Sequence, residues 1–220
     1  MPRDCCDITD RAFTEGEARQ DVRAYRTRGP ARQTQELLAA IRRLDLKDSS
    51  LIDVGGGIGA VHHELLQDVA RTAVHVDASS AYLNAAREET ERLGHGDRVT
   101  FIHADFTDVA HDLPPADIVT MDRVVCCYPD FRALLQAAAN KADRALVMSY
   151  PRESWYVRVG FGIVGAFQRM RRDAFGPFLH PVDEMHGLLQ GLGLTRLCVR
   201  RLFIWEIALY SRDGKLAAAG

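Results

Sequence analysis

The chain has 220 residues, of which 47% are hydrophobic and 26% are charged, and its formal net charge at pH 7 is −2. These values are typical of globular proteins and exclude a disordered, collagenous or fibrous chain. The balanced charge gives no sign of a nucleic-acid partner. The length suits one well-buried domain, so we expect residues 1–220 to form a single domain.

The five cysteines occur as adjacent pairs at 5–6 and 126–127 and as Cys198. Neighbouring cysteines seldom reach good disulfide geometry, and no pair has the C-x-x-C spacing. The pattern therefore predicts reduced thiols in a cytoplasmic protein, with neither a disulfide framework nor a metal site. The first ten residues lack the apolar segment of a secretory signal. The longest apolar stretch, 155–167, is too short to span a membrane.

Short apolar runs alternate with helical stretches along the middle of the chain. Strands are predicted at residues 51–54, 72–76, 99–103, 118–121 and 145–149, and helices at 58–69, 81–93, 131–142 and 182–192. This alternation predicts a doubly wound, Rossmann-like α/β fold with a mostly parallel sheet. Two β-rich runs, 194–203 and 204–211, follow with almost nothing between them. They predict an antiparallel C-terminal hairpin that completes a seven-stranded sheet.

Two segments lie outside this alternation. Residues 1–50 are predicted to be helical, because Leu37, Leu38, Ile41 and Leu44 form an apolar face. Residues 152–180 form a connection long enough to contain its own helix or to be functional. The core of the domain is thus expected at 51–151 and 181–212.

A glycine-rich turn, Asp53-Val-Gly-Gly-Gly-Ile-Gly59, follows the first predicted strand. Glycines at such a turn permit positive φ and let a ligand approach the backbone, at the edge where open α/β sheets bind ligands. Gly55-x-Gly57-x-x-Ala60 also fits the dinucleotide fingerprint, which leaves an NAD(P)-dependent oxidoreductase as an alternative. A carboxylate at position 53 suits a ligand with an ammonium and a sulfonium better than a pyrophosphate.

The chain resembles the class I S-adenosylmethionine-dependent methyltransferases over residues 51–212. The resemblance rests on LIDVGGGIG, on HVDAS and HADF after the second and third strands, on DIVTMDRVVCCYP at the fourth, and on the hairpin. It implies S-adenosylmethionine as cofactor, with Asp77 on the ribose and Asp105 and Phe106 at the adenine. The remaining contacts that it implies, toward the methionine end, are Asp53, Gly55, Gly57, Gly59 and Asp122.

A narrower resemblance links the chain to the magnesium-protoporphyrin O-methyltransferases. It rests on RGPARQT at 28–34, CCYPD at 126–130 and LHP at 179–181. This resemblance implies that the N-terminal helices act as a lid. That family methylates a propionate carboxylate and has His-Tyr-Pro after the fourth strand, where this chain has Cys127-Tyr-Pro.

The candidate catalytic side chains near the predicted strand ends are Tyr128, Tyr150, His180 and Cys127. Transfer of a sulfonium methyl needs alignment above all, and a base only when the acceptor is protonated. Three of the four also have a structural alternative: Cys127 as a small buried apolar group, Tyr128 as a packing residue, and His180 as a hydrogen-bond partner within its loop.

Residues 152–172 interleave aromatic and aliphatic side chains with five arginines and a single acid, Glu153. Three interpretations stay open: a basic amphipathic element in peripheral contact with a membrane, a lid over an apolar acceptor site, or a capping helix with a solvated basic face. The first two both favour an apolar, anionic acceptor.

The sequence thus predicts a methyltransferase that transfers a methyl group from S-adenosylmethionine to a small or medium apolar, possibly anionic acceptor, at oxygen. The alternatives are the oxidoreductase and a catalytically inactive, methyltransferase-like binding module. The expected partner is a small-molecule acceptor, without nucleic acid, and the oligomeric state is not indicated.

Overall fold

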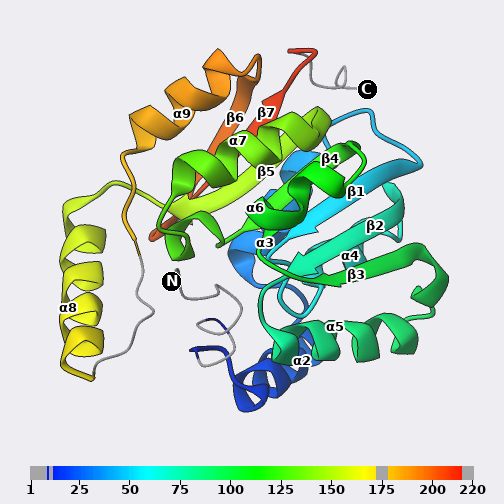
Figure 1. Ribbon diagram of the computed structural model, residues 1–220, viewed down its shortest axis with the longest axis horizontal. Helices are drawn as coiled ribbons and strands as arrows, with labels where there is room; N and C mark the ends of the chain where they lie inside the picture. The colour runs from blue at the N-terminus through cyan, green and yellow to red at the C-terminus, as the bar shows by residue number, and fades with distance from the viewer. Residues whose placement is uncertain (1–8, 10–11, 172–177, 215–220) are drawn as a thin grey trace.

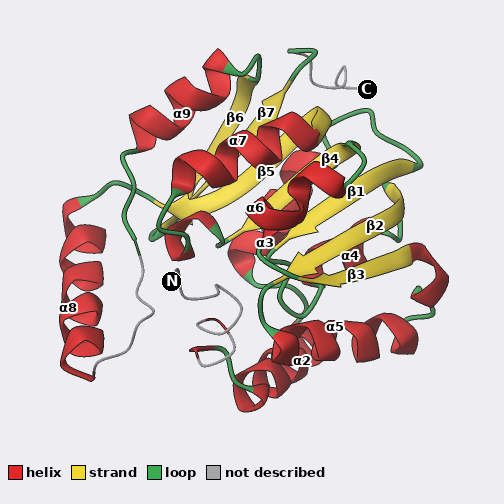
Figure 2. Ribbon diagram, viewed as in Figure 1, coloured by secondary structure: helices red, strands yellow, loops and turns green. Residues whose placement is uncertain are grey.

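A seven-stranded sheet in the order β3-β2-β1-β4-β5-β7-β6 forms the centre of the structure, a computed structural model that describes residues 9, 12–171 and 178–214 (Figures 1 and 2). β1 to β5 run parallel, whereas β7 is antiparallel to both β5 and β6. The strands are β1 (Ser49–Val54), β2 (Ala70–Asp77), β3 (Val99–His103), β4 (Ala116–Asp122), β5 (Ala142–Pro151), β6 (Thr195–Arg201) and β7 (Trp205–Ser211). The predicted doubly wound fold with an antiparallel C-terminal hairpin is confirmed.

Helices cover both faces of the sheet, as parallel strands require. In Figure 1, α6, α7 and α9 lie in front of the sheet and α3 and α4 behind it. The helices are α2 (Glu15–Arg28), α3 (Arg32–Ile41), α4 (Ala60–Leu65), α5 (Ser80–Arg92), α6 (Phe106–Val109), α7 (Phe131–Lys141), α8 (Trp155–Arg171) and α9 (Val182–Gly191). Of the helices described, none combines the length and apolar character needed to cross a bilayer.

Successive strand residues serve opposite cores, because side chains alternate across a sheet. In β4, Val119 and Met121 join the core beneath α7 and α9, whereas Ile118 joins the core beneath α3 and α4. Both cores are closed by helices with apolar faces, and α3 buries Leu37, Leu38 and Ile41 as its sequence pattern predicts. Because β1, β2 and β4 run parallel, their carboxyl ends reach the same edge of the sheet.

Element boundaries differ from the predictions at a few places. The helix after the glycine turn spans only Ala60–Leu65, not 58–69, because Gly59 adopts φ +83° at its start and the chain turns again after Leu65. The connection 152–180 contains α8, which projects at one side of the molecule (Figure 1). The N-terminal segment contains α2, with a capping box between Thr14 and Glu17, and α3.

Substitution of Leu135 in α7 tests how tightly the core is packed, because this side chain is fully buried between helix and sheet. Leu135→Ala is expected to lower the free energy of unfolding by about 2–5 kcal/mol, the cost of lost burial and a residual cavity. The neighbouring Gln136 is exposed, so Gln136→Ala should change stability by less than about 0.5 kcal/mol. Equilibrium denaturation with urea measures both, and equal effects would contradict the packing described.

Candidate active site

The glycine turn between β1 and α4 bends tightly over the ends of the central strands. Gly55 and Gly57 have φ values of +56° and +57°, a region that other L-residues avoid. Space is short as well, because a Cβ at Gly55 would lie 2.7 Å from a methyl group of Val124. The turn therefore requires glycine for both its conformation and its packing, as the sequence predicts.

Asp77, the last residue of β2, fastens this turn. Its Oδ2 accepts a hydrogen bond of 2.9 Å from the Gly57 N–H, and its Oδ1 accepts one of 2.8 Å from the Ser79 N–H. Burial raises the pKa of the Asp77 carboxyl to about 6, and the two backbone hydrogen bonds oppose this shift. The carboxylate thus joins the ends of β1 and β2 while lining a cavity beside them.

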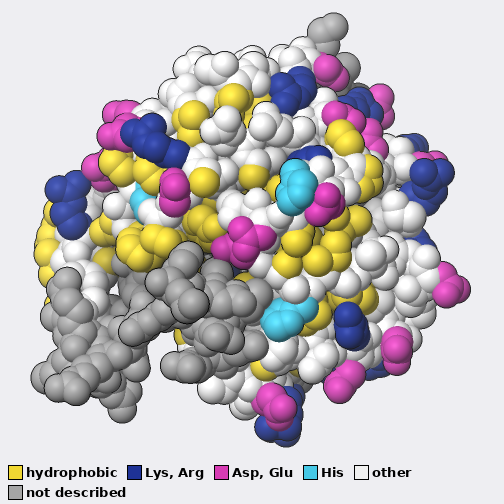
Figure 3. All heavy atoms as spheres, in the orientation of Figure 1, with side chains coloured by type: hydrophobic (Ala, Val, Ile, Leu, Met, Phe, Trp, Pro, Cys, Tyr) yellow, Lys and Arg dark blue, Asp and Glu magenta, His cyan; other side chains and the backbone are white. Residues whose placement is uncertain are grey.

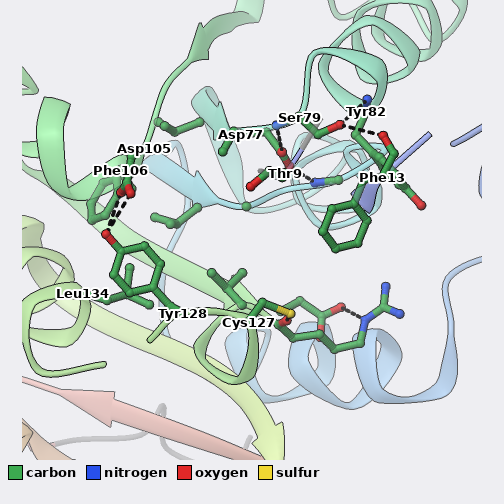
Figure 4. Close-up of a pocket in the computed structure, with 18 of the residues that line it drawn as sticks. Thr9, Phe13, Asp77, Ser79, Tyr82, Asp105, Phe106, Cys127, Tyr128 and Leu134 are labelled. Carbon is green, nitrogen blue, oxygen red and sulfur yellow. Dashed lines mark hydrogen bonds and ion pairs between the residues drawn. The ribbon is translucent and has the colours of Figure 1, made fainter. Parts of the chain in front are cut away.

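Asp105 and Tyr128 face each other across the far end of this cavity. Asp105 is the N-cap of α6, where its side chain accepts a 2.9 Å hydrogen bond from the Thr107 N–H. The Tyr128 hydroxyl lies 2.9 Å from both Asp105 oxygens, and Figure 4 shows it directed toward them. Phe106 is buried beside them and also lines the cavity.

Asp122, the last residue of β4, and Arg123 after it also line this cavity. Thr34 Oγ1 of α3 donates a 2.6 Å hydrogen bond to Asp122 Oδ2, and Ser149 of β5 donates to Oδ1. The Arg123 N–H in turn donates to Ser149 Oγ at 2.8 Å. Arg123 has φ +63°, a strained conformation for a side chain of this size that recurs at functional sites.

Cys126 and Cys127 lie in the short turn after Arg123, with their sulfur atoms 3.8 Å apart. The hydrogen bond between the thiols lowers the pKa of Cys127, and the Arg123 guanidinium lowers it further. The same hydrogen bond, together with burial, raises the pKa of the more deeply buried Cys126. Both thiols line the cavity. Cys127 is therefore the more acidic thiol of the pair.

Two cavities lie at this edge of the sheet, on either side of the glycine turn. The first, of about 360 Å³, extends from Asp77 to Tyr128 (Figure 4), and Trp205 also lines it. The second, of about 420 Å³, lies between the glycine turn and the α2–α3 segment and includes Arg28 and Arg32. Gly55, Gly57, Asp122 and Arg123 are among the residues that line both. Volumes of this size suit small-molecule ligands.

The structure brings most of the predicted site residues to these cavities, but three lie elsewhere. The buried Tyr150 hydroxyl donates to Glu206 Oε1 at 2.7 Å, under α9 and away from both linings. His180 Nε2 lies 2.9 Å from the Tyr128 carbonyl oxygen and 3.1 Å from that of Val125, so it holds the turn behind the cavity wall. Gly59 begins α4 behind the glycine turn.

Sequence reasoning missed several cavity residues, including Phe13, Asp21, Tyr82, Arg123 and Trp205. Tyr82 donates a 2.8 Å hydrogen bond to Asp21 of α2, which joins the N-terminal helices to the cavity rim. Arg123 belongs to the sequence DIVTMDRVVCCYP, one of those that carry the family resemblance, but the resemblance gives this arginine no role. Its left-handed backbone had no signal in the sequence, because arginine does not favour that conformation.

Comparison with known proteins agrees with this geometry. Residues 51–145 match the family model described as a methyltransferase domain. Among curated protein sequences, none matches the chain. A similar solved structure is that of magnesium protoporphyrin IX methyltransferase from Synechocystis with bound SAH. It is 18% identical, with a TM-score of 0.73 over 94% of this chain and 99% of that one.

Two further solved structures share the fold at low sequence identity. An O-methyltransferase family protein from Burkholderia thailandensis is 21% identical, with a TM-score of 0.66 over 91% of this chain and 63% of that one. An O-methyltransferase family 2 protein from Planctomyces limnophilus, in complex with apigenin, is 18% identical. Its TM-score is 0.65 over 91% of this chain and 62% of that one.

Residues 51–145 thus match a methyltransferase domain, and the three solved structures share the fold of the whole chain. This match indicates a methyltransferase. The match favours this assignment over an NAD(P)-dependent oxidoreductase, the alternative that the glycine turn alone left open.

Asp77→Asn tests the Asp77 clamp, by which we mean the two hydrogen bonds that the carboxylate accepts from Gly57 and Ser79. An amide replaces one accepting oxygen with a donor, so the variant faces one backbone N–H with another donor and offers a ribose a weaker acceptor. We expect S-adenosylhomocysteine to bind about 10–100-fold more weakly, as measured by titration calorimetry. Asp97→Asn, at an exposed position far from the cavities, is the matched control. Unchanged affinity in the Asp77 variant would contradict the role given to this carboxylate.

Proposed function

We propose that this methyltransferase transfers the methyl group of S-adenosylmethionine to a carboxylate oxygen of an apolar acceptor. The adenosine part of the cofactor occupies the first cavity, with its ribose at Asp77 and its adenine between Asp105 and Phe106. The methionine part lies along Gly55 and Gly57 toward Asp122. These roles follow the resemblance to the class I methyltransferases, and all six side chains or glycines line the first cavity.

The choice of a carboxylate as the acceptor rests on Arg123. Among the described residues that line the first cavity it is the one cation, and it adjoins Cys127, with apolar Phe13 and Trp205 in the same lining. Its contact with Asp122 is a loose ion pair of 4.0 Å, so the guanidinium keeps donors for another anion. A planar fork of N–H groups suits a carboxylate particularly well.

The chemistry agrees with a carboxylate acceptor because such an acceptor needs no base. One carboxylate oxygen attacks the sulfonium methyl carbon, the carbon–sulfur bond breaks, and the products are a methyl ester and S-adenosylhomocysteine. No proton leaves the acceptor, so alignment is the main requirement. Tyr128, whose hydroxyl is engaged with Asp105, and Cys127 then shape the site. His180 positions the turn between them.

The α2–α3 segment covers the second cavity and is the proposed lid. Tyr25, Arg28 and Arg32 of this segment face the glycine turn across that cavity. The segment is connected to the core through the Thr34–Asp122 hydrogen bond. Because α3 is packed in the core, the moving part is α2 with the turn that leads to α3; its movement would admit the cofactor and then exclude water from the transfer step.

A series of acids tests the proposed acceptor class. With S-adenosylmethionine present, release of S-adenosylhomocysteine is measured for cinnamate, decanoate and magnesium protoporphyrin, and for the matching alcohols and amides. Turnover with one or more acids and none with their neutral counterparts is expected. Turnover confined to the alcohols would contradict a carboxylate acceptor. Bound cofactor with no turnover across the acids, alcohols and amides would favour the inactive binding module.

Arg123→Gln tests the anion contact directly. Loss of a charge-assisted hydrogen bond is expected to raise KM for the acid about 10–100-fold, while affinity for S-adenosylhomocysteine changes little. Arg123→Lys keeps the charge without the planar fork and should fall between wild type and Arg123→Gln. An unchanged KM in both variants would remove Arg123 from the acceptor site.

The outer face of α8 supports delivery of such an acceptor from a membrane surface. Trp155, Val159 and Ile163 recur every four residues, with exposed fractions of 77%, 54% and 66%. The ring of Tyr156 stacks on that of Phe203, which is itself 74% exposed at the β6–β7 turn. Figure 3 shows hydrophobic side chains gathered on the part of the surface beside α8. We propose peripheral contact of residues 152–172 with an anionic bilayer, where Arg152 and Arg158 meet the headgroups.

Vesicle binding tests this contact. Cosedimentation with vesicles of phosphatidylcholine and phosphatidylglycerol should exceed that with phosphatidylcholine alone. Trp155→Glu should weaken it about fivefold or more, since each charge near an anionic surface contributes about 1 kcal/mol. Gln136→Glu adds the same charge on α7 and serves as the control. Equal binding of both variants would exclude α8 from the contact.

A further inference from the structure

Three side chains from separate elements meet in a buried cluster beneath the glycine turn. They are Asp53 of β1, His62 of α4 and His75 of β2, and each is fully buried. Parallel pairing sets Asp53 directly opposite His75, and α4 brings His62 onto the same face of the sheet. The two histidines line neither cavity, whereas Asp53 borders the second one. The methyl transfer proposed above uses neither histidine.

Hydrogen bonds alone do not satisfy this cluster. His62 Nδ1 lies 3.2 Å from Asp53 Oδ2 and also 3.2 Å from His75 Nδ1. A ring nitrogen has one in-plane position, which holds either a proton or a lone pair, so His62 Nδ1 pairs well with only one of the two neighbours. Within the described part of the chain, the Nε2 atoms of both rings have no hydrogen-bond partner. Buried polar atoms left in this state are unusual and costly.

A cation would satisfy all three converging atoms at once. The atoms lie within 4.8 Å of one another. A tetrahedral zinc ion with bonds of about 2.0–2.2 Å sets its ligand atoms about 3.3–3.6 Å apart, close to the two separations of 3.2 Å. Imidazole nitrogens and a carboxylate oxygen are ordinary ligands of such an ion.

The surroundings of Asp53 fit a metal ligand as well. Thr120 Oγ1 of β4 donates a 2.8 Å hydrogen bond to Asp53 Oδ1, which leaves Oδ2 directed at the imidazoles. Such outer contacts orient the carboxylates of metal sites. Because Asp53 borders the second cavity, that cavity offers a route for an ion and for a water molecule in the fourth coordination position.

We propose that Asp53, His62 and His75 bind a divalent transition-metal ion, zinc by the chemistry of two imidazoles and one carboxylate. The ion is structural: it stabilises the glycine turn from below. A Cβ at Gly56 would lie 2.6 Å from His75 Nδ1 and 2.7 Å from Asp53 Oδ2, so the turn rests directly on the cluster. Occupancy is therefore expected to raise both thermal stability and affinity for S-adenosylhomocysteine.

The histidine variants test the site on the full chain. The protein is treated with a chelator, dialysed, and titrated with zinc chloride by calorimetry, and cobalt binding is followed by visible absorbance. Wild type should bind one ion per chain with a rise in Tm. His62→Gln and His75→Gln should lose this one-to-one binding. His111→Gln, in which an exposed histidine is replaced, should retain it.

Two more variants keep the test decisive if a histidine variant folds poorly. Thr120→Val preserves shape but removes the outer hydrogen bond, and should weaken zinc binding about 10–100-fold. The double variant Cys126→Ser, Cys127→Ser should bind as wild type does. Absence of stoichiometric binding in wild type would overturn the proposal. So would binding that survives both histidine variants or depends on the thiols.

Discussion

The site depends on one constraint: a single carboxylate must hold two strand ends together while staying open to a ligand. Asp77 does so by accepting from Gly57 on one side and Ser79 on the other. Parallel pairing of β1 with β2 brings these groups together. The left-handed glycines let the backbone reach the carboxylate without a Cβ in the way. A different arrangement of either strand end would lose the clamp and the first cavity with it.

The sequence was sufficient to predict the sheet because its central strands are buried on both faces. Such strands appear as short apolar runs, and these runs lie between Leu51 and Ser149. The antiparallel hairpin followed from two β-rich runs with no room for a crossover. Boundaries were harder, since the end of α4 depends on a turn after Leu65 that apolar periodicity does not reveal. Cofactor-side residues such as Asp105 could be predicted, because they directly follow strands at the ligand-binding edge.

Side-chain direction was the part that sequence could not provide. Tyr150 and His180 lie near the ends of elements that border the site, yet the pleat turns Tyr150 toward Glu206 and the loop turns His180 toward two backbone carbonyls. Likewise, Asp53, His62 and His75 are spaced nine and thirteen residues apart, which matches no familiar ligand pattern. Strand register and one short helix make them neighbours, and both are properties of tertiary structure.

Phe178 and His180, which follow α8 in the sequence, contact three backbone carbonyl groups of the cavity wall. The Phe178 N–H donates to the Cys126 carbonyl oxygen, and His180 holds those of Val125 and Tyr128. The backbone of the cavity wall is thus tethered to the far end of the insertion that carries the exposed apolar face. These contacts support the acceptor side of the site, whereas the cofactor side is held separately by the hydrogen bonds of Asp77 with Gly57 and Ser79.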